Sequence, residues 1–166
     1  MLGKKIGSIS GPATNKALSA EGSLPKFSTS TEGVGTLAGA EVQSMATYSS
    51  SMRADGTLYG ECPNQGVIMT QDGVATFRAT GVGTFTADGG TNFRGACYFQ
   101  ASAPSLSSLN GICCVYHFDV DAEGNVVAGA SVRNPIHRHE LHSAWHAANN
   151  RRGRCRCLGP HALSAH

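Results

Sequence analysis

Apolar and polar residues alternate along much of the chain between residues 24 and 132, in short runs separated by turns rich in glycine. The clearest run covers residues 112–121. Its even positions Cys114, Tyr116 and Phe118 are more apolar than its odd positions, which include His117 and Asp119. An apolar residue at every second position is typical of a β-strand with one buried face. The pattern therefore predicts a domain built of strands.

Four turn sequences divide these runs: Ala54-Asp55-Gly56, Gln71-Asp72-Gly73, Ala87-Asp88-Gly89-Gly90 and Ala122-Glu123-Gly124-Asn125. Asp-Gly between two extended runs favours a tight hairpin. Successive hairpins give an antiparallel up-and-down meander, here of seven or eight strands. Closing the meander into a barrel hides its two edge strands, so we predict an all-β, antiparallel, eight-stranded β-barrel. A two-sheet β-sandwich has the same periodicity and stays open as the alternative.

Two segments interrupt the strands. Residues 104–110 combine Pro104 at a helix start, Leu106 and Leu109 three positions apart, and Gly111 after the end, which predicts one helix of about two turns. Pro63 cannot donate to a strand ladder, so the sequence from Cys62 to Gly66 predicts a bulge or a strand end.

The chain divides into three parts by composition. Residues 1–23 are rich in Gly, Ser and Ala and are predicted to be irregular, with an edge strand possible over Lys4–Ser10; residues 24–132 form the barrel. Residues 131–166 carry six Arg and one acid, whereas residues 1–130 carry seven Lys or Arg and ten acids. We therefore expect 133–166 to be a poorly ordered Arg/His/Cys-rich tail whose deletion leaves the thermal transition almost unchanged.

The tail offers weak signals for metal and nucleic acid. If the tail is helical, three of its histidines share one face: His139, His142 and His146. We expect any metal binding by these imidazoles to be adventitious. The spacing from His139 to His142 is one residue too short for a His-Glu-x-x-His zinc protease. The Arg151–Arg156 cluster has no interleaved aromatic residues, so we predict no specific nucleic-acid partner and no cofactor.

Compartment and redox state follow from what the sequence lacks. No apolar run approaches the ~20 residues needed to cross a bilayer, and no apolar stretch follows the two N-terminal lysines. These features favour a cytoplasmic protein without a membrane partner. In that compartment the four cysteines of the body, Cys62, Cys97, Cys113 and Cys114, are expected to be buried thiols and not disulfides.

Polar residues on the predicted strands give the candidate site. His117 is the one histidine before the tail, and with Asp119 and the neighbouring charged residues it can form an acid–base set in a cavity. A surface histidine and an ordinary salt bridge are the alternatives. The weak catalytic candidates are Glu61, Arg94 and His117, and the ligand-binding candidates are Arg53, Tyr59, Tyr98 and Asp119.

Several motifs occur in order along residues 3–127: Gly3-Lys4-Lys5-Ile6-Gly7, Arg53-Ala54-Asp55-Gly56-Thr57-Leu58-Tyr59-Gly60-Glu61, Gln65-Gly66-Val67-Ile68-Met69-Thr70, Gly81-Val82-Gly83 and Ser108-Leu109-Asn110-Gly111. The set resembles a group of small bacterial proteins of unassigned function that look like allene oxide cyclase and dirigent-type eight-stranded barrels. The resemblance implies the barrel but no catalytic residue, because no catalytic motif of those enzymes is matched.

The resemblance ends after Ala128, where members of the group finish with a strand rich in Trp and charged residues. A shifted reading frame would explain the change, and translation of the other two frames at the 3′ end tests this hypothesis. A shift at that point would leave the eighth strand incomplete and expose two barrel edges.

Three functions remain open from the sequence. The first is a binding module that holds a small apolar or amphipathic ligand in the barrel lumen. The second is an enzyme of isomerase or cyclase type that uses the same cavity. The third is a structural protein whose outward apolar faces join it into a homo-oligomer.

Overall fold

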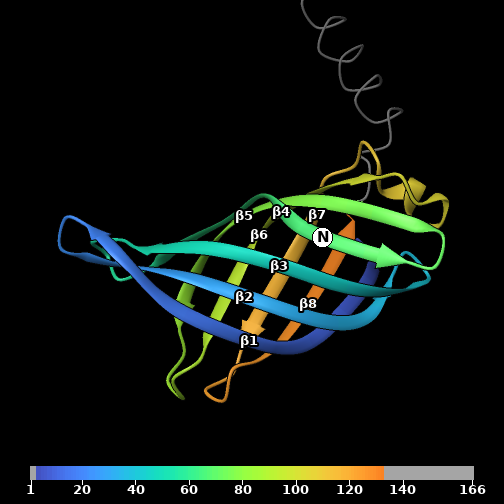
Figure 1. Cartoon of the computed structure of the whole chain (residues 1–166). Helices are drawn as coiled ribbons and strands as arrows, with labels where there is room; N and C mark the ends of the chain where they lie inside the picture. The colour runs from blue at the N-terminus through green and yellow to red at the C-terminus, as the bar shows by residue number, and fades with distance from the viewer. Residues whose placement is uncertain (1–2, 133–166) are drawn as a thin grey trace, which may run out of the picture. The chain divides into compact units, whose positions relative to one another are not determined.

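The computed structural model describes residues 3–132, and residues 133–166, with the predicted tail and its histidines, lie outside the described part. The described chain forms eight strands and one short 3₁₀ helix, η1 (Figure 1). In chain order these are β1 Lys5–Glu21, β2 Leu24–Leu37, β3 Ala40–Met52, β4 Leu58–Thr70, β5 Gly73–Phe85, β6 Thr91–Ala101, η1 Pro104–Leu109, β7 Cys114–Val120 and β8 Asn125–Val132.

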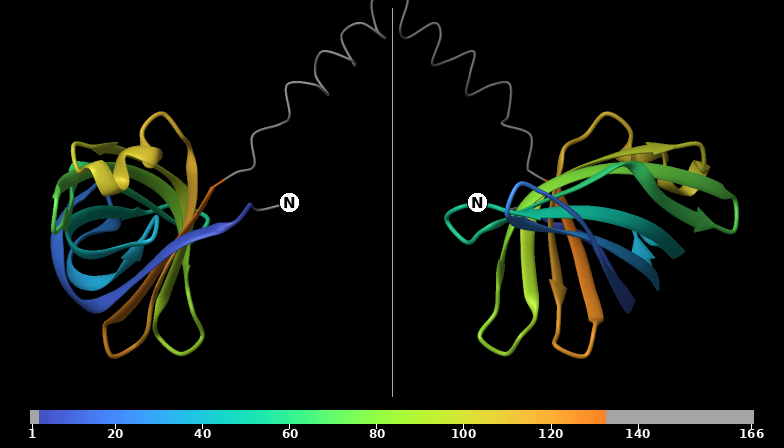
Figure 2. Two further views of the ribbon diagram at one scale, coloured as in Figure 1. Left: turned by 90° about the vertical axis from the view of Figure 1, so that its right-hand side faces the viewer. Right: turned by 60° about the vertical axis from the view of Figure 1, so that its left-hand side comes forward.

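Each strand pairs antiparallel with the strand that follows it, and β8 pairs with β1, so the sheet is a closed barrel (Figure 2). The prediction of an all-β, up-and-down, eight-stranded barrel is confirmed, and the sandwich alternative is wrong. Closure removes both sheet edges, which is the physical reason a meander of this length adopts it.

The last strand completes the barrel. β8 runs along β7 from Cys114 opposite Val132 to Val120 opposite Val126, and along β1 from Gly7 opposite Ala130 to Pro12 opposite Asn125. The expectation of an incomplete eighth strand is therefore wrong for residues up to 132. The seven paired positions with β7 leave no open edge at this seam.

The N-terminal segment differs from the prediction. Residues 1–23 were expected to be irregular, yet β1 has 17 residues and is the longest strand of the described chain. It pairs with β2 from Gly7 opposite Leu37 to Glu21 opposite Leu24. The residues of its second half, 14–20, are exposed, so no apolar alternation marks them in the sequence. Backbone pairing with β2 supplies what the local propensity of this half lacks, since β8 pairs only with residues 5–12.

The predicted turns are present. In the β3–β4 turn the carboxylate of Asp55 accepts hydrogen bonds from the backbone N–H and the hydroxyl of Thr57, at 3.0 and 2.7 Å. Gly56 in the same turn has φ +82°, a conformation that suits glycine. The predicted irregularity of β4 is also present, as a shift of register between Cys62 and Gly66.

The predicted helix forms as the six-residue 3₁₀ helix η1. Leu106 and Leu109 are buried and belong to the core cluster of the barrel. The chain after η1 is held by Asn110, whose side-chain amide accepts from the N–H of Ala101 (2.7 Å) and donates to its carbonyl (3.0 Å). η1 thus anchors the β6–β7 connection to the barrel.

Inward and outward positions alternate along the strands. In β5, Ala75, Phe77 and Ala79 are buried, whereas Arg78 and Thr80 between and beside them are exposed. The side chains inside the barrel form one cluster that extends to η1. Within the described part of the chain, no helix has the length and apolar character to cross a membrane.

Candidate functional site

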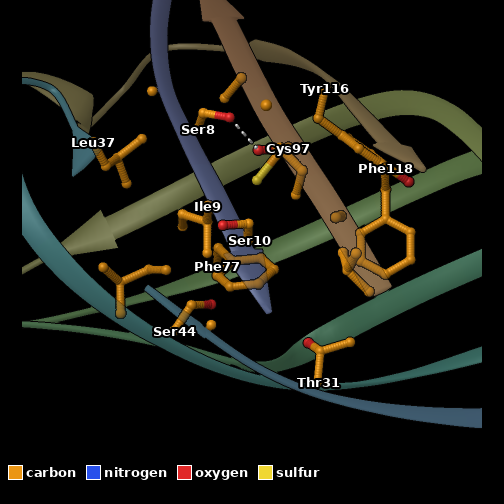
Figure 3. A pocket seen from close by; sticks show the side chains of 18 of the residues that line it. Ser8, Ile9, Ser10, Thr31, Leu37, Ser44, Phe77, Cys97, Tyr116 and Phe118 are labelled. Carbon is orange, nitrogen blue, oxygen red and sulfur yellow. Dashed lines mark hydrogen bonds between the residues drawn. The ribbon is translucent and has the colours of Figure 1, made fainter. Parts of the chain in front are cut away.

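The barrel interior contains a cavity of about 90 Å³. Ile9 of β1, Leu37 of β2 and Phe77 of β5 contribute apolar surface, and residues of all eight strands line the space, which Figure 3 shows from close by. The further apolar members of the lining are Ile68, Ala79, Cys97, Phe99, Phe118, Val126, Ala128 and Ala130. An apolar cavity enclosed by strands is the usual ligand site of a small barrel.

A second hollow of about 40 Å³ adjoins this cavity. Four residues line both spaces: Tyr48, Ala79, Tyr116 and Phe118. The rings of Tyr48 and Phe118 meet with their centroids 5.1 Å apart. Polar groups make up a larger share of the lining of this second hollow, with Thr29, Ser49 and Ser50 among its residues. The lumen therefore has two mainly apolar compartments, with aromatic side chains at the boundary between them.

Tyr116 reaches across the inner wall of the barrel. It lies opposite Gly95 of β6, which in turn lies opposite Gly81 of β5. Its hydroxyl oxygen lies so close to Gly81 that a β-carbon on that residue would collide with it. Only glycine at position 81 leaves room for the phenol in this place.

The hydroxyl of Tyr116 has no hydrogen-bond partner among residues 3–132. Burial raises the pKa of this phenol to about 12, and the nearby Cys97 and Cys62 add to the shift. The group is therefore a neutral hydrogen-bond donor at physiological pH.

Tyr48 is the second luminal phenol. Burial is the main cause that raises its pKa, with Cys62 adding to the effect, while a hydrogen bond with Thr31 acts in the opposite direction. Tyr48 also stays protonated at neutral pH, but its hydroxyl already has a partner in the barrel wall.

Three thiols belong to the interior. Cys62, Cys97 and Cys114 are buried, and Cys97 lies opposite Cys114 on the neighbouring strand. Burial raises the pKa of both Cys97 and Cys114. The prediction of buried thiols is confirmed for these three residues and wrong for Cys113, which is exposed because it directly precedes β7 on the other face. Within residues 3–132, no three metal-binding side chains gather into a site.

The predicted acid–base residues of β6 and β7 lie on the outer face of the barrel. The Arg94 guanidinium contacts the Asp119 carboxylate at 2.5 Å, with 56% and 44% of the two side chains exposed. His117 lies opposite Arg94 and packs over Gly129 of β8, where a β-carbon would collide with its ring. The structure thus brings Arg94, His117 and Asp119 together, but outside the lumen.

The other sequence candidates are scattered. Glu61 borders the smaller hollow, but it lies between the buried Gly60 and Cys62, so the alternation of β4 puts its side chain on the outer face. Arg53 stacks over the ring of Tyr59, 5.1 Å from its centroid. Tyr98 is 55% exposed on the outer face.

Several luminal residues were not among the sequence candidates, notably Tyr48, Phe77 and Tyr116. The apolar alternation of residues 112–121 marked the face of Tyr116 as the more buried one, so this signal was present. Most of the sequence candidates are instead charged residues, and Arg94 and Asp119 among them face the solvent.

The geometry defines a closed eight-stranded antiparallel barrel with a small, mainly apolar lumen. No family model and no curated protein matches the chain. Two crystal structures of bacterial proteins of unknown function are similar to it. The protein RPA1785 from Rhodopseudomonas palustris has a TM-score of 0.65 at 14% identity, over 78% of this chain and 95% of that chain. A protein from Clostridium acetobutylicum ATCC 824 has a TM-score of 0.64 at 12% identity, over 78% of this chain and 97% of that one. At this identity the likeness establishes a shared fold.

Proposed function

We propose that the barrel binds a small, uncharged, apolar molecule in its lumen. The observation that carries the proposal is the cavity of about 90 Å³, whose lining surface is mainly apolar. Close packing normally leaves few voids larger than a water molecule inside a domain, and an apolar void of ~150 Å³ binds benzene. The volume therefore suits a compact molecule of about that size or smaller.

The charge of the lining supports an uncharged ligand. The lining contains no Lys, Arg or His, and its one carboxylate residue, Glu32, is exposed. An ionised carboxylate or ammonium brought into the lumen would lose its hydration without gaining an opposite charge. Fatty-acid carboxylates and cationic ligands are thus disfavoured.

An isomerase or cyclase activity and a homo-oligomeric structural role remain alternative proposals with less support. The resemblance to allene oxide cyclase and dirigent barrels supplies no reaction, because fold alone does not specify chemistry. Exposed apolar side chains such as Val34 and Met45 supply outer surface that a homo-oligomer can use. We keep the cytoplasm as the proposed compartment, on the sequence grounds given above.

Native mass spectrometry of the protein purified from cells tests the proposal by showing any retained small molecule. A second measurement follows benzene binding by NMR in a matched pair of variants. Ala128→Leu fills the lumen from β8, while Val127→Leu changes its neighbour on the outer face, which is 49% exposed. We expect Ala128→Leu to weaken benzene binding at least tenfold and Val127→Leu to leave it unchanged. Equal binding by both variants would overturn the luminal site.

A further inference from the structure

We infer that the luminal ligand is a neutral molecule carrying at least one hydrogen-bond acceptor, such as a ketone or ether oxygen, to which the Tyr116 hydroxyl donates. This inference rests on the proposed function and names the chemical class of the ligand. It separates two classes that the cavity volume alone does not distinguish, pure hydrocarbons and molecules with an oxygen atom.

The position of Tyr116 gives its hydroxyl access to a ligand. Tyr116 lines both the larger apolar cavity and the smaller hollow, so a molecule in the first space meets the phenol at the boundary to the second. The labelled side chains in Figure 3 show Tyr116 beside Phe118 at one end of the space, with Phe77 and Ser44 toward the other. The ligand body is then held by the apolar lining, and its oxygen is directed toward Tyr116.

The bonding state of Tyr116 makes it the recognition group. The Tyr116 hydroxyl has no partner among residues 3–132 and keeps accessible surface, so a ligand acceptor can reach it and accept its hydrogen bond. Tyr48, the other phenol at the boundary, is already hydrogen-bonded with Thr31. Because the Tyr116 phenol keeps its proton up to high pH, it offers an O–H donor to an acceptor atom of the ligand.

The wall around Tyr116 is built to hold the phenol in place. Gly95 and Gly81 lie in register on the two neighbouring strands, and the hydroxyl of Tyr116 lies against Gly81. A group fixed in this manner loses little rotational freedom on binding, which favours affinity.

The test compares two probes of the same shape, cyclopentanone and methylenecyclopentane, which differ in carrying an oxygen atom or a CH₂ group. Binding is followed by NMR through the methyl groups of Ile9 and Ile68, which line the larger cavity. The variants are Tyr116→Phe and, as the matched control, Tyr98→Phe, which removes the same hydroxyl from the outer face. A thermal melt of each variant confirms that it folds.

We expect Tyr116→Phe to raise the Kd of cyclopentanone about three- to tenfold, the range for one neutral hydrogen bond. The Kd of methylenecyclopentane should change less than about twofold, and Tyr98→Phe should affect neither probe. If Tyr116→Phe shifts both probes equally or neither, the inference is overturned while the luminal site stands. If the unmodified protein binds neither probe, the proposed function itself falls.

Discussion

The carboxylate of Asp72, in the β4–β5 turn, accepts hydrogen bonds from the backbone N–H and the hydroxyl of Ser105, at 2.9 and 2.7 Å. Ser105 is in η1, 33 residues further along the chain. The same carboxylate accepts from the hydroxyl of Thr70 at 2.7 Å. One turn aspartate therefore ties the β6–β7 connection to the neighbouring β4–β5 hairpin.

This arrangement predicts a dependence of stability on pH. Hydrogen bonds from Thr70 and then Ser105 lower the pKa of Asp72 below its ordinary value of 3.8, and the turn carboxylates Asp55 and Asp121 are shifted in the same direction by their own turns. A carboxylate with a lowered folded-state pKa contributes stability above its unfolded pKa and loses it as the pH falls through the folded value. We expect the melting temperature to fall as the pH drops below about 4.

The variant Asp72→Asn isolates one contribution. It should melt below the unmodified protein at pH 7, because the amide offers one acceptor where the carboxylate offers two. Thermal melts at pH 7 and pH 2.5 (about the range set by carboxylate titration) should show the gap between the two proteins narrowing in acid. A gap of the same size at both pH values would contradict this role for the charge.

Shortening a buried side chain of η1 should lower the stability of the fold. Leu106 is completely buried in the core cluster, so Leu106→Ala leaves a cavity and is expected to lower the free energy of unfolding by about 2–5 kcal/mol. Urea denaturation measures the change, with the exposed Ser108→Ala as the control in the same helix. A loss below about 1 kcal/mol would show that η1 is packed loosely on the barrel.

The thiols of the described chain should differ in reactivity. Cys113 is exposed, while Cys62, Cys97 and Cys114 are buried, and burial raises the pKa of Cys97 and Cys114. Since the thiolate is the reactive form, iodoacetamide at pH 8 (about half a unit below an ordinary thiol pKa) should modify Cys113 and spare the buried three. Peptide mapping reads out each residue, and labelling after unfolding in urea is the control. Rapid labelling of Cys97 in the native protein would mean that the lumen opens readily.

The outer-face cluster should matter little for folding or luminal binding. Arg94 and Asp119 form an exposed ion pair, and such pairs contribute less than about 1 kcal/mol. We expect Arg94→Ala to change the free energy of unfolding by less than this and to leave benzene binding in the lumen unaltered. Weaker benzene binding by this variant would link the outer face to the cavity.

The order of the strands and the barrel could be predicted from the sequence, because turn motifs and apolar alternation recur along it. Asp-Gly turns fix the order of the hairpins, and the alternation around Tyr116 marks the inward face of β7. Most of β1 was not predicted, because its second half is exposed and shows no alternation of apolar and polar residues. Pairing with β2 makes this half a strand. These long-range pairings are properties of the assembled sheet and not of the local sequence.

The candidate site was harder to predict for a related reason. Charged residues are the usual candidates for a site in a sequence, yet Arg94, His117 and Asp119 lie on the outer face of the barrel. The lumen is lined by phenols, thiols and apolar side chains, and all eight strands contribute residues to it. Their convergence depends on barrel closure and on the glycines that admit Tyr116, which no short motif encodes.

The seam between β1 and β8 has a consequence for synthesis in the cell. Ser8 donates a hydrogen bond to the carbonyl of Ala128, a contact that spans 120 residues. A growing chain cannot form this seam until residues 125–132 have left the ribosome. One edge of β1 therefore stays unpaired through most of translation. Slow translation or truncation before β8 would prolong that exposure and give neighbouring nascent chains time to aggregate.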